Sequence, residues 1–94
     1  MSNGFLKPCQ IEQIRQTYAP GTRIELQHME DSQPVPDGTR GSVAYVDDAG
    51  TIHMKWDNGR TLGLVPGEDQ FRKLTAQELQ EEAALQQEPV MKMN

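Results

Sequence analysis

The sequence predicts one small, mainly β domain with a helix at each end, and three observations predict it. The chain has 94 residues, which is enough for one domain. Between Pro20 and Leu74, short stretches of alternating apolar and polar residues are separated by turn-forming Gly, Pro, Asn and Asp. Apolar residues recur at helical spacing before Pro20, and a helix-start signal follows Leu74.

The first expected element is a short amphipathic helix that begins at Pro8. Proline suits the first helical position, because an N–H there would have no partner within the helix. Ile11, Ile14 and Tyr18 follow at a spacing that places them on one stripe, and Pro20 ends the pattern. We expect this helix to cover the core rather than to bind a partner.

Residues 22–29 predict the first strand, with Ile24, Leu26 and His28 facing inward. Residues 30–38 are rich in turn formers, and their two prolines cannot donate to a strand ladder. We therefore expect an irregular loop there.

Residues 39–46 predict the second strand. Gly41 suggests a bend or bulge, and Val43 and Val46 are out of phase with simple alternation, which also indicates a bulge. A second turn follows at residues 47–50.

The most specific local pattern is a hairpin over residues 51–65. Ile52, Met54 and Trp56 alternate with polar residues. Asn58-Gly59 is a strong hairpin signal, because these two residues are expected to supply the two positive-φ positions that a tight turn needs. The strand after the turn carries Leu62 and Leu64, and residues 71–73 predict a short last strand. Because Trp56 shares a face with apolar residues, we expect it in the core rather than on a binding platform.

The C-terminal helix has a sharply defined start. Thr75 and Glu78 form the capping-box pattern T-x-x-E, and Leu74 and Leu79 are placed as a hydrophobic staple. The rest of the helix has few apolar anchors, and we expect it to fray from Gln86. The chain thus divides into a flexible N-terminus (1–7), a domain with its leading helix (8–74), and a C-terminal helix with a frayed tail (75–94).

About five short strands with tight turns and a proline-bearing loop predict a small SH3-like antiparallel barrel. An OB-fold is the main alternative, but it requires a helix where this chain has only the Asn58-Gly59 turn. The expected core comprises Ile11, Ile14, Ile24, Leu26, Val43, Ile52, Met54, Trp56, Leu62, Leu64 and Phe71.

Composition excludes several classes of function. The net charge of −5 argues against a generic binder of phosphate backbones, although it leaves a local basic patch open. The single Cys9 excludes an intrachain disulfide, and the sequence shows no secretory signal or membrane span, so we expect a cytoplasmic protein.

The sequence offers no pattern typical of catalysis or metal binding. His28 and His53 are the only histidines, and a zinc site needs about four nitrogen or sulfur ligands. The serines lack the context of a nucleophile and its base, and no glycine-rich phosphate loop is present. We expect no metal, no cofactor and no enzymatic activity.

Several sequence blocks carry a family resemblance. P-G-T-R-I-E-L (20–26), P-D-G-T-R-G (36–41), V-D-D (46–48), I-H-M-K-W-D-N-G (52–59) and L-V-P-G-E-D-Q-F-R (64–72) follow one another. Over roughly residues 11–74 the chain resembles a bacterial family catalogued only as a domain of unknown function. The resemblance implies occurrence in Gram-positive bacteria, phages, plasmids and conjugative elements. It implies no activity, ligand or catalytic residue.

Two functional hypotheses remain open for this small module. The first is protein–protein interaction, through a groove beside the 30–38 loop, through strand addition to an open sheet edge, or through the C-terminal helix. This helix is also a candidate for self-association. The second is weak nucleic-acid binding through a local basic patch. The candidate binding residues for either function are His53, Lys55, Arg60, Arg40 and Tyr45.

Overall fold

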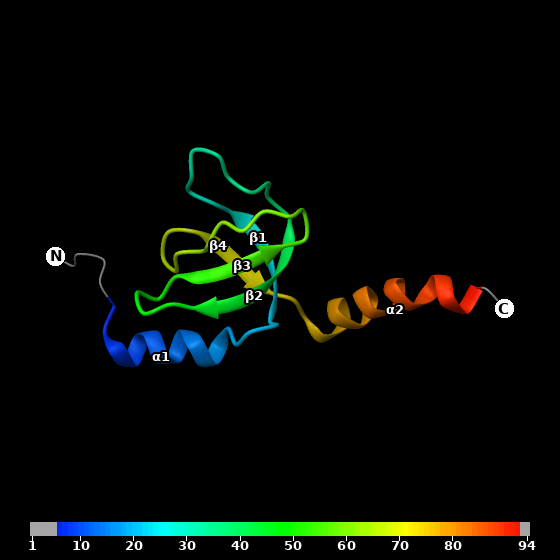
Figure 1. Ribbon diagram of the computed structural model, residues 1–94, viewed down its shortest axis with the longest axis horizontal. Coiled ribbons are helices and arrows are strands. Elements are labelled where there is room, and N and C mark those ends of the chain that lie inside the picture. The colour runs from blue at the N-terminus through cyan, green and yellow to red at the C-terminus, as the bar shows by residue number, and fades with distance from the viewer. Residues whose placement is uncertain (1–5, 93–94) are drawn as a thin grey trace.

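The computed structural model describes the backbone of residues 6–92 and the side chains of residues 6–85. It contains two helices and four strands, in the order α1 (Pro8–Thr17), β1 (Arg23–His28), β2 (Arg40–Val46), β3 (Ile52–Trp56), β4 (Gln70–Lys73) and α2 (Ala76–Lys92) (Figure 1). The expected flexibility of residues 1–5 falls outside the described residues. The backbone of α2 continues to Lys92, and fraying from Gln86 stays a prediction.

The four strands form one open antiparallel sheet in the order β3-β2-β1-β4. A register shift between Val43 and Tyr45 interrupts the pairing of β2 with β3, so the bulge expected in this strand is confirmed. The mainly β fold with a helix at each end is also confirmed. The architecture differs from the expectation in the number of strands.

The segment expected as a strand after the hairpin turn forms only an isolated pair with β3. Ile52 and Leu64 exchange two backbone hydrogen bonds, of 2.9 and 2.8 Å. The indole Nε1 of Trp56 donates to the carbonyl oxygen of Leu62 over 2.8 Å, so that carbonyl bonds a side chain of β3. The structure therefore has four strands where the sequence predicts about five.

The turn at Asn58-Gly59 is also built differently from the prediction. Gly59 has a φ of 92°, whereas no non-glycine residue in the described part of the chain has positive φ. The Gly59 N–H donates to the Trp56 carbonyl, and Asn58 Oδ1 accepts from the Arg60 N–H, each over 2.9 Å. The expectation for Asn58 was wrong, because a longer hairpin loop needs the left-handed conformation only at its last residue.

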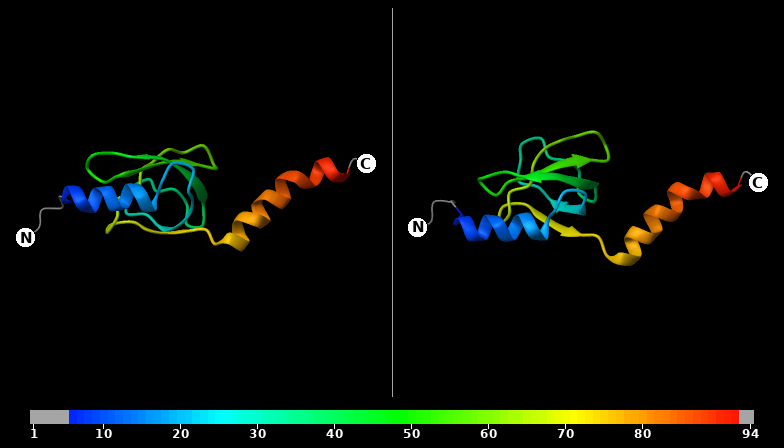
Figure 2. Two further views of the ribbon diagram at one scale, coloured as in Figure 1. Left: turned by 90° about the horizontal axis from the view of Figure 1, so that it is seen from below. Right: turned by 60° about the horizontal axis from the view of Figure 1, so that its bottom comes forward.

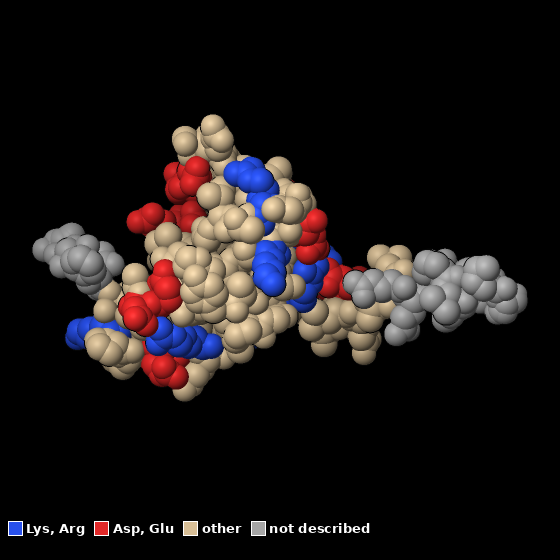
Figure 3. Space-filling view, in the orientation of Figure 1, with Lys and Arg blue, Asp and Glu red and all other residues tan. Residues whose placement is uncertain are grey.

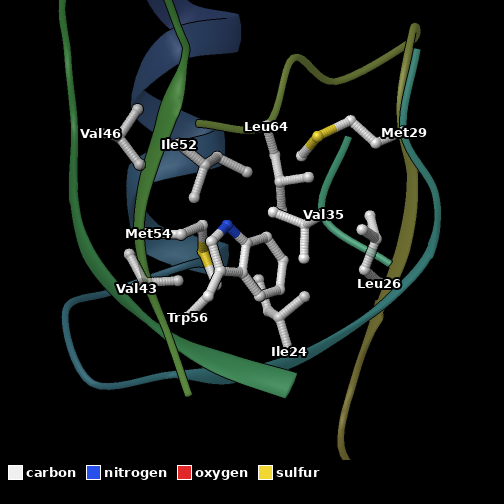
Figure 4. Close-up of a cluster of buried hydrophobic side chains, with 10 residues drawn as sticks. All are labelled: Ile24, Leu26, Met29, Val35, Val43, Val46, Ile52, Met54, Trp56 and Leu64. Atoms are coloured by element: carbon white, nitrogen blue, oxygen red, sulfur yellow. The ribbon is translucent and has the colours of Figure 1, made fainter. Parts of the chain in front are cut away.

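A single hydrophobic cluster fills the concave side of the sheet (Figure 4). Its members are Ile24, Leu26, Met29, Val35, Val43, Val46, Ile52, Met54, Trp56 and Leu64. Trp56 is 3% exposed, which confirms its place in the core. A Cβ on Gly41 would lie 2.8 Å from Trp56 Cε3, so this glycine gives the indole room.

The predicted core is largely correct, but some residues differ in each direction. Ile14, Leu62 and Phe71 are only partly buried and pack against the cluster from outside, and His28, expected to face inward, is exposed. The prediction missed Met29, Val35, Val46 and Leu74, and Val35 is fully buried although two prolines flank it. The 30–38 loop is thus irregular, as expected, but it also contributes a core residue.

The two helices relate to the sheet differently (Figures 1 and 2). Helix α1 packs beside β2 with Ile11 buried, and Arg15 Nη2 donates to Asp48 Oδ1 over 2.7 Å. This agrees with the expected covering role. Helix α2 begins beside the sheet and projects away from it.

The role of Trp56 can be tested with two substitutions that both remove its hydrogen bond but remove different amounts of side-chain volume. We expect Trp56→Phe to lower the free energy of unfolding by about 1–3 kcal/mol, because it leaves the Leu62 carbonyl without its donor. Trp56→Ala should cost roughly 3–5 kcal/mol. Urea unfolding followed by circular dichroism measures both. Met54→Leu, a volume-conserving control, should cost less than about 1.5 kcal/mol. A loss for Trp56→Phe no larger than that for Met54→Leu would contradict the structural role of the indole N–H.

Candidate functional site: the charged face of the sheet

The convex side of the sheet carries a row of charged side chains on three neighbouring strands. Strand alternation turns Ile24 and Leu26 into the core, so Arg23 and Glu25 point outward. Glu25 lies opposite Arg40 of β2 on one side and opposite Arg72 of β4 on the other. We call Arg23, Glu25, Arg40 and Arg72 the charged face.

Arg23 joins two carboxylates that come from distant parts of the chain. Its Nη1 and Nη2 donate to the two oxygens of Asp57 over 2.9 and 2.6 Å. Its Nε and Nη2 donate to the two oxygens of Glu82 on α2 over 3.0 and 2.9 Å. These bidentate contacts raise the pKa of Arg23 and lower the pKa values of Asp57 and Glu82.

Arg72 makes the second bidentate contact with α2. Its Nη1 and Nη2 each donate to an oxygen of Glu78 over 2.8 Å, and Nη2 also donates to Glu25 over 2.7 Å. Glu78 closes the predicted capping box as well, since it accepts the Thr75 backbone N–H over 2.8 Å while Thr75 Oγ1 accepts the Glu78 N–H over 3.1 Å. Arg72, with the Thr75 N–H second, lowers the pKa of Glu78 to about 2.

Arg40 lies between these two pairs. Its guanidinium contacts Glu25 and Glu78 at 3.4 Å and Glu82 at 3.3 Å. Partial burial by itself lowers the pKa of Arg40, but the hydrogen bonds that Arg40 donates to Glu82 and Glu25 outweigh this effect, so the pKa is raised. The charged face and α2 therefore form one connected ion-pair network.

Side-chain ion pairs, rather than apolar contacts, hold α2 against the sheet. The network side chains that join them are between 20% and 35% exposed, so water screens their attraction. Leu79 is 43% exposed and Leu85 is 69% exposed, so neither is sealed against the domain. A groove of about 390 Å³ lies between the start of α2 and the sheet. It is lined by Arg23, Ser42, Asp57, Leu79, Glu82 and Ala83.

Two of the predicted binding residues form a stacked pair beside the charged face. The rings of Tyr45 and His53 lie 4.4 Å apart with an angle of 6° between their planes, and Tyr45 is 53% exposed. His53 Nε2 lies 2.8 Å from Asp47 Oδ2, and this contact is the main cause that lowers the pKa of Asp47. Asp47, expected only as a turn residue, thus also positions the imidazole.

The other predicted residues occupy three different places. Lys55 is exposed on β3, pairs with Ser42 across the ladder, and shares a strand face with His53. Arg40 belongs to the ion-pair network. Arg60 Nη2 donates to the Gln33 carbonyl over 2.7 Å, so it ties the 30–38 loop to the hairpin and lies apart from the others.

The sequence-based candidates omitted Arg23, Glu25, Glu78 and Glu82 as binding residues. Two features of the sequence indicate that these residues lie on exposed faces. Arg23 and Glu25 flank the inward Ile24, which predicts that both face outward. Glu78 and Glu82 are four residues apart, which places them on one side of a helix. Which strand arginine pairs with which glutamate of α2 depends on the tertiary structure and has no signal in the local sequence.

Comparison with known families identifies the relatives of this chain. Residues 7–74 match the family described as Domain of unknown function (DUF4314). The chain belongs to this family. No curated protein and no solved structure matches it. The DUF4314 match includes every residue of the charged face and ends before α2, so the two glutamates that pair with the arginines lie beyond it.

Two further findings concern the described residues of the DUF4314 chain. No helix within that part combines the length and the hydrophobicity needed to cross a membrane. Nor does that part bring three or more His, Cys, Asp or Glu side chains together in an arrangement suited to a metal ion.

The pKa of Glu78 gives a direct test of the network. Because the folded-state pKa lies below the ordinary 4.5, the stabilisation from Glu78 is complete above about 4.5 and is lost as the pH falls towards about 2. We expect an NMR titration of the Glu78 carboxyl to give a midpoint near 2 in the unmodified chain. Arg72→Gln should raise that midpoint towards 4.5, whereas Arg15→Gln on α1 should not. A midpoint near 4.5 in the unmodified chain would show that Glu78 is not docked.

Proposed function

We propose that this protein is a small non-enzymatic interaction module with an SH3-like barrel, and that α2 is its element for binding a protein partner. The proposal includes a cytoplasmic location and a mobile-element setting. The location rests on the sequence argument, and the mobile-element setting rests on the family resemblance. The observation that carries the proposal is the exposure of Leu79 and Leu85 on a helix whose first turns are fixed to the domain.

The strand order supports the SH3-like type of barrel. The sheet runs β4-β1-β2-β3, and the Ile52–Leu64 pair adds the segment before Pro66 on the outer side of β3. Five consecutive segments then curve around one core, in which Leu64 is fully buried. In the proposed barrel, the segment of this isolated pair would be the fifth strand.

The geometry of α2 supports binding through the helix. With 17 residues, α2 is about 25 Å long, and it projects from the sheet (Figures 1 and 2). Helices of this length are marginal in water unless an apolar side is packed against something. A partner with an apolar groove would bury Leu79, which shares a side of the helix with Ala76 and Ala83, as in helix-in-groove recognition. Leu85 lies about 120° round the helix from Leu79 and would make a separate contact with that partner.

Charge substitutions on α2 test this proposal in the full chain. We expect the double variant Leu79→Glu, Leu85→Glu to lose a protein that the unmodified chain retains in an affinity pull-down from its native host after nuclease digestion. Gln80→Glu with Ala84→Glu adds the same charge at exposed positions of α2 and should retain that protein. Retention by the leucine variant, or retention of nothing but nuclease-sensitive material by the unmodified chain, would contradict the proposal.

Sedimentation of the purified chains identifies the case in which the partner is a second copy. Self-association through α2 predicts a dimer for the unmodified chain and for the Gln80→Glu, Ala84→Glu control. The leucine variant should then sediment as a monomer.

A further inference from the structure

We propose that the charged face, extended by Lys55 and Tyr45, is a binding surface for single-stranded nucleic acid that the acidic side of α2 covers. This inference goes beyond the proposed protein interaction and does not rest on it. It concerns the convex side of the sheet, whereas the proposed function concerns the exposed leucines of α2.

The first support is the arrangement of cations on adjacent strands. Arg72 and Arg40 flank Glu25 in one row across β4, β1 and β2. Arg23, Ser42 and Lys55 form the next row across β1, β2 and β3. Figure 3 shows Lys and Arg side chains, with Asp and Glu side chains among them, where the domain meets the start of α2. A strip of cations on a sheet surface suits a phosphate backbone despite the negative total charge of the chain.

The second support is an exposed aromatic ring beside those cations. Tyr45 is 53% exposed and stacks in parallel on His53, which shares a face of β3 with Lys55. Nucleic bases stack on such rings without regard to sequence, while neighbouring cations hold the backbone. Among the described residues, the three arginines donate the hydrogen bonds that join the sheet to α2, so α2 leaves the Tyr45–His53 pair open.

The third support is the way in which α2 meets the arginines. The carboxylates of Glu78 and Glu82 accept bidentate hydrogen bonds from Arg72 and Arg23, which is also how guanidinium groups bind phosphate. With α2 docked, the three arginines contact four carboxylates, from Glu25, Asp57, Glu78 and Glu82, and Lys55 adds a fourth cation to the surface. Without the two from α2, the local net charge rises from zero to two positive charges.

The fourth support is that the contacts between α2 and the arginines can be released. Its contacts are partly exposed ion pairs, and Leu79 is not sealed against the sheet. A polyanion with several phosphates competes for the same arginines with more negative charge than the two glutamates supply. The exposed ring and Lys55 favour nucleic acid over an acidic protein helix, which would make no use of a stacking surface.

The test removes the two covering charges from the full chain. Glu78→Gln with Glu82→Gln keeps the helix start, because glutamine also serves in a capping box. Fluorescence anisotropy then measures binding of a labelled single-stranded DNA or RNA of about 16 nucleotides in about 50 mM salt. We expect the double variant to bind about tenfold more tightly than the unmodified chain.

Matched variants show whether a gain in affinity comes from this surface or from the change in total charge. Glu12→Gln with Glu81→Gln changes the total charge equally at exposed positions and should leave binding at the level of the unmodified chain. Adding Arg40→Gln or Tyr45→Ala to the Glu78→Gln, Glu82→Gln chain should remove most of the gain. Circular dichroism confirms that each variant remains folded.

Three outcomes would overturn the proposal. The double variant binds no more tightly than the matched control, or its gain survives the added Arg40→Gln. Alternatively, an acidic peptide with the sequence of residues 75–85 binds the double variant while the oligonucleotide does not. This last outcome would assign the surface to an acidic protein partner.

Discussion

The register of β4, β1 and β2 is the constraint on which the other features depend. Glu25 lies opposite both Arg40 and Arg72, and the same alternation turns Ile24 and Leu26 into the core. A shift of one residue would exchange these two sets, because side chains alternate between the faces of a sheet. One pattern of pairing therefore fixes the hydrophobic cluster on the concave side and the charged face on the convex side.

The two sides of the sheet are stabilised by different interactions, hydrophobic burial on the concave side and ion pairs on the convex side. The core excludes water, and Trp56 both fills it and donates to the Leu62 carbonyl at its edge. The convex side relies on ion pairs that water partly reaches, so its hold on α2 depends on salt and pH. A firm domain and an electrostatically attached helix thus coexist in a chain of 94 residues.

The sequence predicts the elements better than their contacts. Alternation located the strands, and the T-x-x-E pattern located the start of α2, because both signals are local. The turn at Asn58 and the missing strand were mispredicted, since the Trp56–Leu62 hydrogen bond and the loop conformation depend on packing. Val35 was missed because prolines flank it. The pairing of Arg23 with Glu82, 59 residues away, carries no local signal, although the outward direction of Arg23 could be predicted.

Amide hydrogen exchange of α2 at low and high salt tests the central claim, that ion pairs dock this helix on the sheet. At about 1 M salt the screening length falls to about 3 Å, which weakens partly exposed ion pairs. The account predicts that amides of residues 79–85 are protected at low salt and lose most of that protection at high salt. Amides of β2 and β3 should keep theirs. Protection of α2 that is equal at both salt concentrations would contradict electrostatic docking.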